Sequence, residues 1–175
     1  LRRQGKDIID LAMGNPDKPP PGPVIEKLKE VLKDPKIHRY SASKGIFHLR
    51  KEIANWYEKR FGVKLDPEEE VIVCIGSKEG ISHLALAIFD KGDVVLVPNP
   101  TYPSHLYSVI IAGGTIYDMP LTKENNFIPD LSQPIYDRYP KPKSIILSYP
   151  NNPTTQIVDI DFFKEVIKFA KKMTL

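Results

Sequence analysis

Short apolar runs alternate along this chain with longer amphipathic segments. The runs rich in branched residues predict strands over residues 71–75, 94–97, 115–119 and 144–148, and a shorter extended segment over 8–13. Apolar residues at three- and four-residue spacing predict helices over residues 24–32, 46–61, 81–89, 104–112 and 162–172. This alternation is typical of βαβ units, so we predict an α/β fold, a three-layer sandwich in which helices cover both faces of a mostly parallel sheet.

The charge and composition argue against several classes of protein. Lysine and arginine number 25 against 22 aspartates and glutamates, and this balance gives no reason to expect nucleic acid as a partner. No apolar run approaches the roughly 18 residues of a membrane helix, so we expect no membrane partner. The lone cysteine, Cys74, can form neither an intrachain disulfide nor a cysteine metal cluster. We therefore expect a cytoplasmic protein.

The histidines show no metal-ligand pattern. They stand at His38, His48, His83 and His105, without the close spacing that a metal site requires. We expect surface or packing roles for them and no metal site.

One predicted strand leads into a loop suited to phosphate. Gly-Ser-Lys-Glu-Gly at residues 76–80 follows the strand at 71–75 and opens the next helix. Free backbone N–H groups at a helix start attract anions, and Ser77 and Lys78 add a hydroxyl and a positive charge. The loop is neither a P-loop nor a Gly-x-Gly-x-x-Gly fingerprint. On this loop alone, a capped turn without a ligand is the favoured interpretation.

Two further strands end in loops rich in proline. Pro98, Pro100 and Pro103 surround Tyr102, whose ring could lie flat against a planar ligand or fill a gap in a rigid loop. After the last predicted strand comes Asn152, whose amide offers a donor and an acceptor, although an ordinary Asn-Pro turn is the alternative. Ligands of open α/β sheets bind at such strand ends, and proline would hold these loops rigid.

The order of these motifs is more specific than any one of them. Gly14-Asn15-Pro16, Tyr40 with Gly45, the 76–80 loop, Pro-Thr-Tyr at 100–102 and Asn-Asn-Pro-Thr at 151–154 follow one another along the chain. In this order they resemble the N-terminal half of a class I/II aminotransferase, a pyridoxal-phosphate (PLP) enzyme of the aspartate aminotransferase fold. The resemblance covers essentially the whole chain. It implies the large domain of a fold type I PLP-dependent transferase, in part, with the start of a small domain.

Within this family the bacterial glutamate–pyruvate (alanine) aminotransferases are the most similar branch. The resemblance rests on residues 13–17, 76–81, 97–103 and 139–143. LL-diaminopimelate aminotransferases share the 76–80 loop. The family usually has glycine after Asn-Pro-Thr, whereas Thr155 and Gln156 follow here, a variation that resembles the alanine branch.

The resemblance assigns roles to six positions. Gly14 would present its backbone to the substrate carboxylate, and the cofactor pyridoxal 5'-phosphate would be bound by Tyr40, Ser77, Lys78, Tyr102 and Asn152. Ser77 and Lys78 would hold the phosphate, Tyr102 would stack on the pyridine ring, and Asn152 would bond the ring hydroxyl oxygen. Tyr40 would reach the phosphate of the neighbouring subunit, which implies a homodimer with shared active sites.

The reacting groups of the family have no counterpart in these 175 residues. Transamination needs a Schiff-base lysine and a carboxylate on the pyridine nitrogen, and we expect both beyond Leu175. Ser41-Ala42-Ser43-Lys44 matches the lysine motif literally but precedes the phosphate loop, so we reject it. Asp159 and Asp161 come too early to be the carboxylate. We therefore expect no catalytic residue within this chain, which on this interpretation is part of a longer enzyme and inactive alone.

These expectations define the domains and the function. Residues 1–22 would contribute to the small domain and residues 23–175 would form the truncated N-terminal part of the large PLP-binding domain. The leading interpretation is transamination between alanine and 2-oxoglutarate, giving pyruvate and glutamate. LL-diaminopimelate or aspartate aminotransferase is the nearest alternative. Other classes left open are a non-catalytic phosphate-binding α/β module and a PLP-fold domain that serves only in dimerisation or regulation.

Overall fold

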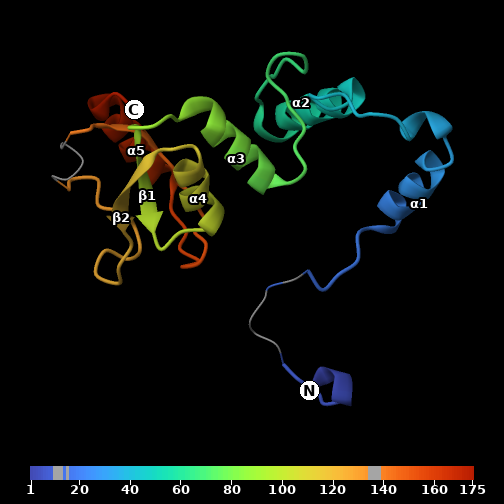
Figure 1. Cartoon of the computed structure of the whole chain (residues 1–175), viewed down its shortest axis with the longest axis horizontal. Helices are drawn as coiled ribbons and strands as arrows, with labels where there is room; N and C mark the ends of the chain where they lie inside the picture. The colour runs from blue at the N-terminus through green and yellow to red at the C-terminus, as the bar shows by residue number, and fades with distance from the viewer. Residues whose placement is uncertain (10–13, 15, 134–138) are drawn as a thin grey trace.

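The computed structural model describes residues 1–9, 14, 16–133 and 139–175 of the chain (Figure 1). The α-helices are α1 (Gly22–Val31), α2 (Phe47–Phe61), α3 (Ser77–Ile88), α4 (Pro103–Ile111) and α5 (Ile160–Met173), with 3-10 turns at Arg2–Gln4 and Pro35–Ile37. The strands are β1 (Val94–Asn99), β2 (Thr115–Pro120) and β3 (Pro142–Ile145). None of the helices described is long and apolar enough to cross a bilayer.

The sheet is parallel throughout its described strands. Its order is β2-β1-β3, so the first strand in the chain lies in the middle. Residues 94–98 of β1 are buried, as expected for a strand that is covered on both faces and paired on both edges. The predicted α/β fold with a parallel sheet is confirmed.

Alternate residues of β1 face the two helical layers. Val95 and Val97 pack with Val109 of α4 and with Ala85 and Phe89, at the end of α3 and just after it. On the opposite face, Leu96 packs with Met119 of β2 and Met173 of α5. A strand with period-two alternation therefore separates two apolar clusters, and the result is three layers: α3 and α4, the sheet, and α5 (Figure 1).

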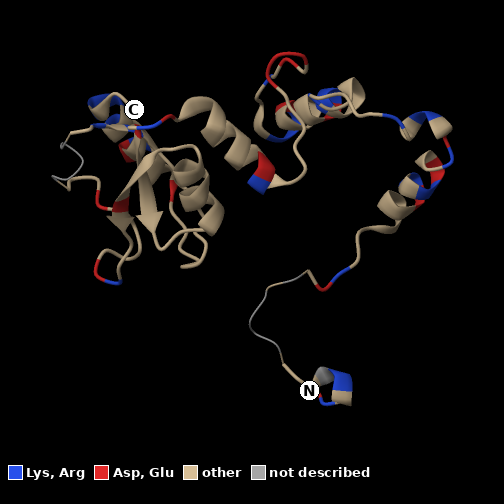
Figure 2. Ribbon diagram, viewed as in Figure 1, with Lys and Arg blue, Asp and Glu red and all other residues tan. Residues whose placement is uncertain are grey.

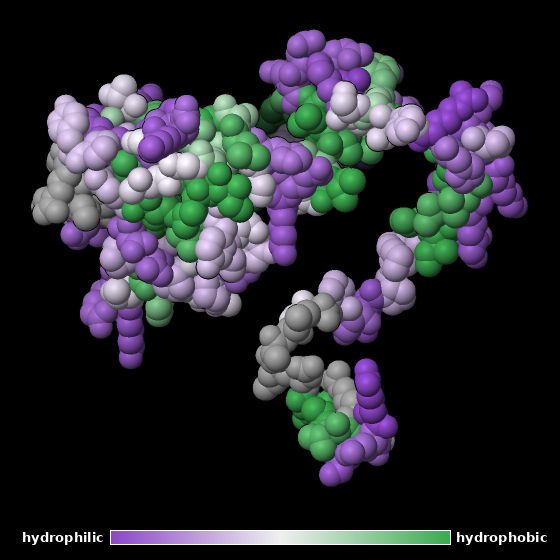
Figure 3. Space-filling view, viewed as in Figure 1, coloured by the Kyte–Doolittle hydropathy of each residue, from purple (hydrophilic) through white to green (hydrophobic). Residues whose placement is uncertain are grey.

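The N-terminal helices lie apart from this sandwich. Figure 1 shows α1 and α2 on a stretch of chain that leads away from the sheet, and Figure 3 shows apolar side chains on their surfaces. Helix α1 has no buried residue, and α2 buries Arg50 and Ala54. The Arg50 guanidinium donates to the carbonyls of Gly45 and Pro67 and pairs with the Glu68 carboxylate at 3.0 Å. This arginine ties α2 to the loop that follows it.

Two predicted strands differ from the structure. The run at 71–75 forms no strand: the Val73 N–H donates to the Lys44 carbonyl at 3.0 Å, and Ile75 is 92% exposed, because no described strand lies beside it. Strand β3 covers Pro142–Ile145 rather than 144–148. The prediction for residues 8–13 falls partly on 10–13, which lie outside the described residues.

Strand β1 also continues past Val97, the predicted end of the strand, to Asn99. The backbone nitrogen and carbonyl of Pro98 face the β3 side of the strand, as those of Leu96 do. The Leu96 carbonyl accepts a hydrogen bond from the Ile146 N–H at 3.0 Å. Pairing with β3 ends at that point, so the missing N–H of Pro98 leaves no gap in the ladder. The proline therefore does not terminate the strand.

Candidate functional site

The candidate site lies at the carboxyl edge of the sheet, where β1 ends and α4 begins. Tyr102 is the N-cap residue of α4, with φ −66° and ψ 130°, and Pro103 occupies the first helical position. Proline is favoured there because its fixed φ suits the helix and its missing N–H would have had no helical partner. The chain therefore turns sharply after β1 and leaves the Tyr102 ring at the helix start.

The start of α3 provides exposed backbone donors. Gly76 is the N-cap residue with φ 86° and ψ 156°, a left-handed conformation that glycine adopts without steric cost, and no side chain caps the helix. The first helical bond is Gly80 N–H to the Gly76 carbonyl, at 3.4 Å. The N–H groups of Ser77 and Lys78 therefore precede the helical ladder, and the positive end of the helix dipole lies there.

Glu79 stabilises this turn from within the helix. Its carboxylate accepts the Ile75 N–H, and it lies 3.9 Å from the imidazole of His83. Figure 2 shows one basic residue (blue) and one acidic residue (red) next to each other at this end of α3, while the rest of the helix carries no charged residue. The acidic side chain thus turns back toward the strand-like segment and does not cap the donors of Ser77 and Lys78.

Two of the predicted cofactor residues meet here. The Lys78 ammonium lies 5.6 Å from the centre of the Tyr102 ring, within cation–π range. A hydrogen bond from this ammonium is the main cause that lowers the pKa of the Tyr102 phenol, with a smaller contribution from Ser104. The same bond raises the pKa of Lys78. The structure therefore places a cation and a flat aromatic ring at one uncapped helix start.

His105 is a neighbour of Tyr102 for which the sequence alone predicts a surface or packing role. Its imidazole is 9% exposed and meets the Tyr102 ring edge-to-face, with centroids 5.8 Å apart and planes at 75°. Burial lowers its pKa and so favours the neutral ring. Its position one helical turn after Tyr102 is the signal that identifies it, because residues at i and i+3 share a helix face.

The loop after β3 is ordered around Asn151. This residue is 4% exposed, and its amide oxygen accepts from the N–H and hydroxyl of Thr154, at 3.2 and 2.8 Å. The peptide bonds before Pro150 and Pro153 are cis. Asn152, the predicted cofactor residue, is exposed on the turn at residues 152–154. The structure thus presents Asn152 at the carboxyl edge of the sheet but gives it no contact with Tyr102 or Lys78 among the described residues.

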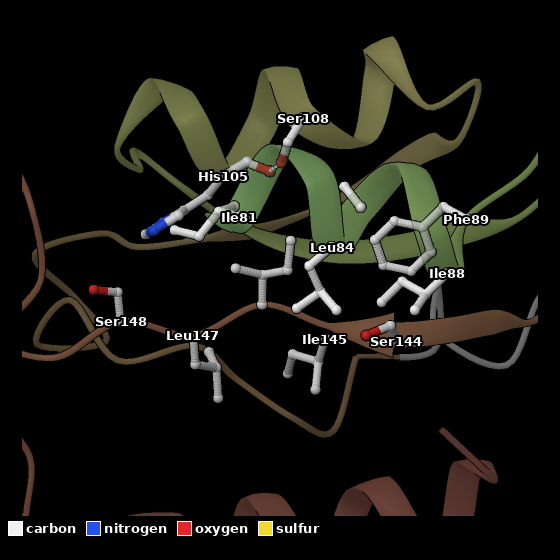
Figure 4. A pocket seen from close by; sticks show the side chains of 12 residues that line it. Ile81, Leu84, Ile88, Phe89, His105, Ser108, Ser144, Ile145, Leu147 and Ser148 are labelled. Carbon is white, nitrogen blue, oxygen red and sulfur yellow. Dashed lines mark hydrogen bonds between the residues drawn. The ribbon is translucent and has the colours of Figure 1, made fainter. Parts of the chain in front are cut away.

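A mostly apolar groove of about 430 Å³ runs between α3 and the segment after β3. Its apolar walls are formed by Leu84, Ile88, Ile145 and Leu147 (Figure 4). The imidazole of His105 extends toward the end of the groove where Ser148 lies, and the Ser108 hydroxyl donates to the His105 carbonyl at 3.4 Å. The groove therefore connects the surroundings of Tyr102 with the loop that carries Asn152.

The other two predicted residues lie away from this cluster. Tyr40 is fully exposed on the loop between α1 and α2, beside His38 and Arg39. Gly14 is exposed, and no atom lies within 4 Å of where its Cβ would be. Within the described part of the chain, neither residue contacts Lys78 or Tyr102. Their roles remain predictions.

The residues that do meet fit a phosphorylated planar ring. A helix start with free donors, together with the Lys78 ammonium, suits a doubly charged phosphate. The half-exposed Tyr102 ring, beside that cation, is the type of surface on which a flat heteroaromatic stacks. The chemistry of this donor set is therefore compatible with pyridoxal 5'-phosphate.

Comparison with known proteins gives concordant results. Residues 6–175 match the family model described as "Aminotransferase class I and II". The chain is 50% identical to the glutamate-pyruvate aminotransferase AlaC of Escherichia coli (strain K12) over 171 residues, which cover 98% of the chain and 42% of AlaC. It is 47% identical to the LL-diaminopimelate aminotransferase of Aquifex aeolicus over 169 residues, 97% of the chain and 44% of that enzyme.

Solved structures share the fold. The substrate-bound BacF structure from Bacillus subtilis superimposes with a TM-score of 0.88 at 36% identity, covering 99% of this chain and 44% of that one. The chain thus spans between 42% and 44% of the length of these three proteins. Enzymes of this family depend on pyridoxal phosphate. With the family model matched over residues 6–175 and the fold shared, the chain belongs to the class I and II aminotransferases.

Proposed function

We propose that the protein containing this chain is a PLP-dependent aminotransferase and that residues 1–175 supply the phosphate-binding and ring-stacking side of its active site. The observation that carries this proposal is the Lys78–Tyr102 pair at the uncapped start of α3, with 5.6 Å between the ammonium and the ring centre. A purely structural turn would need neither an exposed cation nor an aromatic ring at that place. Membership of the family supports the same conclusion.

Each of the proposed cofactor-binding residues would act by a simple physical effect. The N–H groups and hydroxyl at Ser77, with the Lys78 ammonium, would bind the phosphate and fix one end of the cofactor. Tyr102 would stack against the ring and set its plane, and Asn152 would donate a hydrogen bond to the ring oxygen. When bound, the cofactor supplies an electron-poor ring that draws electrons from the substrate amino acid.

Gly14 and Tyr40 would complete the site. The Gly14 backbone would face the substrate carboxylate, and the fully exposed Tyr40 would reach the cofactor phosphate of a second subunit in a cytoplasmic homodimer. We place the lysine that carries the cofactor, and the carboxylate that pairs with the pyridine nitrogen, in the part of the relatives' length that residues 1–175 do not cover.

For the substrates, we propose a small amino acid and a 2-oxo acid, most specifically alanine and 2-oxoglutarate. Identity to the glutamate-pyruvate enzyme is 50%, and Thr155 stands where the family usually has glycine after Asn-Pro-Thr, a variation that resembles the alanine branch. Identity to an LL-diaminopimelate aminotransferase is 47%, close enough to make this the competing substrate class. Aspartate is the third candidate.

Spectroscopy of the full-length protein tests both the proposed enzyme class and the proposed substrate. Pyridoxal 5'-phosphate added to the purified protein should give the visible absorbance of a bound cofactor, and alanine should change that band. A band that responds to LL-diaminopimelate or aspartate but not to alanine would replace the substrate assignment and keep the enzyme class. If no band forms, the protein is not a PLP enzyme, and the phosphate-binding module is the remaining interpretation.

A matched pair of tyrosine variants tests the stacking role. Tyr102→Ala should weaken cofactor affinity about two- to twelvefold, because an aromatic contact of this kind contributes roughly 0.5–1.5 kcal/mol beyond burial. Tyr107→Ala is the control, since Tyr107 is an exposed tyrosine on the same helix without a role in the site. Equal affinities for the two variants would refute stacking by Tyr102.

A further inference from the structure

Helix α3 is packed against the sheet on one side only. Ala85 and Phe89 belong to the apolar cluster that covers the central strand β1. On the side that faces the segment after β3, the groove described above remains open, and Leu84 and Ile88 are exposed. Apolar packing therefore leaves the β3 side of the helix free to move.

A register shift in β3 brings a lysine to the end of this groove. Between two successive residues of β1, the pairing jumps from Pro142 to Ser144, so Lys143 is an extra residue in β3. Irregularities of this kind re-aim a side chain. Figure 4 shows Ser144, the residue after Lys143, next to Ile88 at one end of the groove. The shift thus places Lys143 beside the end of α3.

The Lys143 ammonium joins three elements at the amino edge of the sheet. It donates to the carbonyl of Ile88, the last residue of α3, at 2.8 Å, and it pairs with a carboxylate oxygen of Asp93 at 2.7 Å. The same oxygen accepts the Asp90 N–H at 2.9 Å, and Asp93 directly precedes β1. The hydrogen bond from Lys143 is the main cause that lowers the pKa of the Asp93 carboxyl.

A cation between these two acceptors suits the end of a helix. The last carbonyls of an α-helix have no partner within the helix, and the negative end of the helix dipole lies there. Lys143 satisfies one of these carbonyls from a position 55 residues later in the chain. Asp93 holds the same ammonium from the side of the sheet. The end of α3 is therefore tied to β1 and β3 through one side chain.

The start of the same helix lies at the candidate site. There the Lys78 ammonium is 5.6 Å from the centre of the Tyr102 ring, and the backbone donors precede the helical ladder. Twelve helical residues form a rod about 18 Å long. A tilt or slide at one end of such a rod displaces the other end, and hydrogen bonds weaken steeply with distance and angle.

We propose that Lys143 is a positioning residue of the phosphate site: by fixing the end of α3 to Asp93 and β3, it sets where the backbone donors at Ser77 and Lys78 lie. This inference rests on the proposed function, because it requires that the phosphate of pyridoxal 5'-phosphate binds at the start of α3. It requires no contact between Lys143 and the cofactor. It also gives the register shift in β3 a purpose, which is to aim the lysine at the helix end.

Four variants of the full-length protein test this role. Lys143→Met removes the ammonium but keeps most of the side chain, Lys143→Arg keeps a cation of similar length, and Asp93→Asn removes the charge that holds the ammonium. Lys91→Met is the matched control, because Lys91 is an exposed lysine on the turn that leads to Asp93. The readouts are the dissociation constants for pyridoxal 5'-phosphate and for pyridoxal, whose ratio measures what the phosphate contributes to binding.

We expect Lys143→Met to reduce the preference for the phosphorylated ligand about two- to tenfold, the value of roughly one net hydrogen bond, with little change in the affinity for pyridoxal. Asp93→Asn should reduce this preference less. Lys143→Arg should restore most of it, and Lys91→Met should match the wild type. If Lys143→Met fails to fold, Asp93→Asn decides by the same ratio.

The outcomes distinguish this inference from the proposed function. Wild-type protein that binds no pyridoxal 5'-phosphate overturns both. Wild-type binding with an unchanged ratio in Lys143→Met overturns the positioning role alone. A parallel loss of affinity for both ligands also overturns it, because this would indicate a general loss of stability. An equal loss of preference in Lys91→Met overturns it as well, since any distant positive charge would then serve.

Discussion

The two halves of this chain use the same amphipathic pattern to different effect. In the sandwich, Leu96 is completely buried between Met119 and Met173. In α1, Leu28 belongs to an equally regular apolar stripe but is 57% exposed, and no residue of that helix is buried. The pattern predicts the helices of both regions, but most of the buried apolar side chains belong to the sandwich.

The difference shows where the folding free energy of each region comes from. Burial of branched side chains on both faces of β1 stabilises the sandwich, at roughly 25 cal/mol per Å² of apolar surface. Helix α1 relies on Lys27–Glu30 and Lys29–Glu26 pairs at 2.6 and 2.7 Å, which are exposed and contribute only a few tenths of a kcal/mol each. We infer that the helices before residue 62 open independently of the sheet.

The largest expected effect separates the two regions directly. Leu96→Ala should lower the free energy of unfolding of the sandwich by about 4 kcal/mol, since the side chain lies in the centre of the sheet and its loss leaves a cavity. Leu28→Ala should change it by less than about 0.5 kcal/mol, because an exposed leucine has little to lose. Denaturant titration of the 175-residue chain, followed by circular dichroism, measures both.

Similar losses for the two variants would contradict this comparison. They would mean that the apolar face of α1 is covered in solution by something as extensive as the sandwich core. Hydrogen exchange gives an independent check, because amides of β1 should be protected far longer than those of α1.

The second effect concerns the contact between Gly45 and Val73, which joins the N-terminal helices to the segment that leads into α3 and is called the joint below. A Cβ on Gly45 would lie 2.4 Å from Cγ2 of Val73, and the backbone there has φ +87°. Gly45→Ala should therefore destabilise the joint by roughly 2–3 kcal/mol through the contact and the left-handed backbone together. The matched control is Gly62→Ala, where φ is +69° but no atom lies within 4 Å, so that only the backbone cost of about 1 kcal/mol remains.

The measurement is again the free energy of unfolding of the two variants. A difference of at least 1 kcal/mol between them assigns a packing role to the Gly45–Val73 contact. If both variants lose the same amount, the loop at Gly45 moves away at little cost, and the two regions are less closely joined than the structure indicates.

Most of the fold was predictable because its signals are local. Apolar periodicity gave five helices and the central strands to within a few residues, and turn residues marked their ends. The strand predicted at 71–75 was wrong, because a β-branched run indicates only a preference, whereas a strand also requires a neighbour. The strand predicted over 94–97 ends before Pro98, because the sequence does not show that pairing with β3 has already ended on the side that the proline N–H would face. The domain boundary predicted at residue 22 stays a prediction.

The site residues that lie close to a predicted strand or helix could be predicted from the sequence better than those that depend on distant contacts. Lys78 and Tyr102 each follow an apolar run in the sequence, and the resemblance assigned both to one cofactor; the structure brings them together at the starts of α3 and α4. His105 was missed as a site residue, because a lone histidine on a helix is usually a surface or packing residue and only its ring contact with Tyr102 distinguishes it. Tyr40 is fully exposed and Gly14 has no atom within 4 Å of where its Cβ would be, so no contact among the described residues places either one at the site.

The third effect is smaller and lies within the sandwich. Thr155 has φ +62°, a left-handed conformation that costs a β-branched residue about 1–2 kcal/mol. Thr155→Gly should raise the free energy of unfolding by about 0.5 kcal/mol, since part of the gain is offset by the greater entropy of glycine in the unfolded chain. Thr155→Ala keeps a Cβ and should give no such gain. A stabilising alanine variant would show that the strain lies in the side chain and not in the backbone.

The smallest effect tests to which region the start of α3 belongs. The Lys78 ammonium stabilises the phenolate of Tyr102 and holds its pKa below the ordinary value, so Lys78→Met should raise that pKa. The tyrosinate absorbance of each protein, minus that of its Tyr102→Phe counterpart, isolates this one phenol during a pH titration. Lys91→Met, which removes an exposed charge elsewhere, should leave the difference unchanged. Because Lys78 is on α3 and Tyr102 is on α4, the shift exists only if the first turn of α3 is held against the sandwich. A phenol that titrates alike with and without Lys78 would mean that this turn moves with the N-terminal region, and the phosphate-binding half of the site would then be assembled only when a ligand binds.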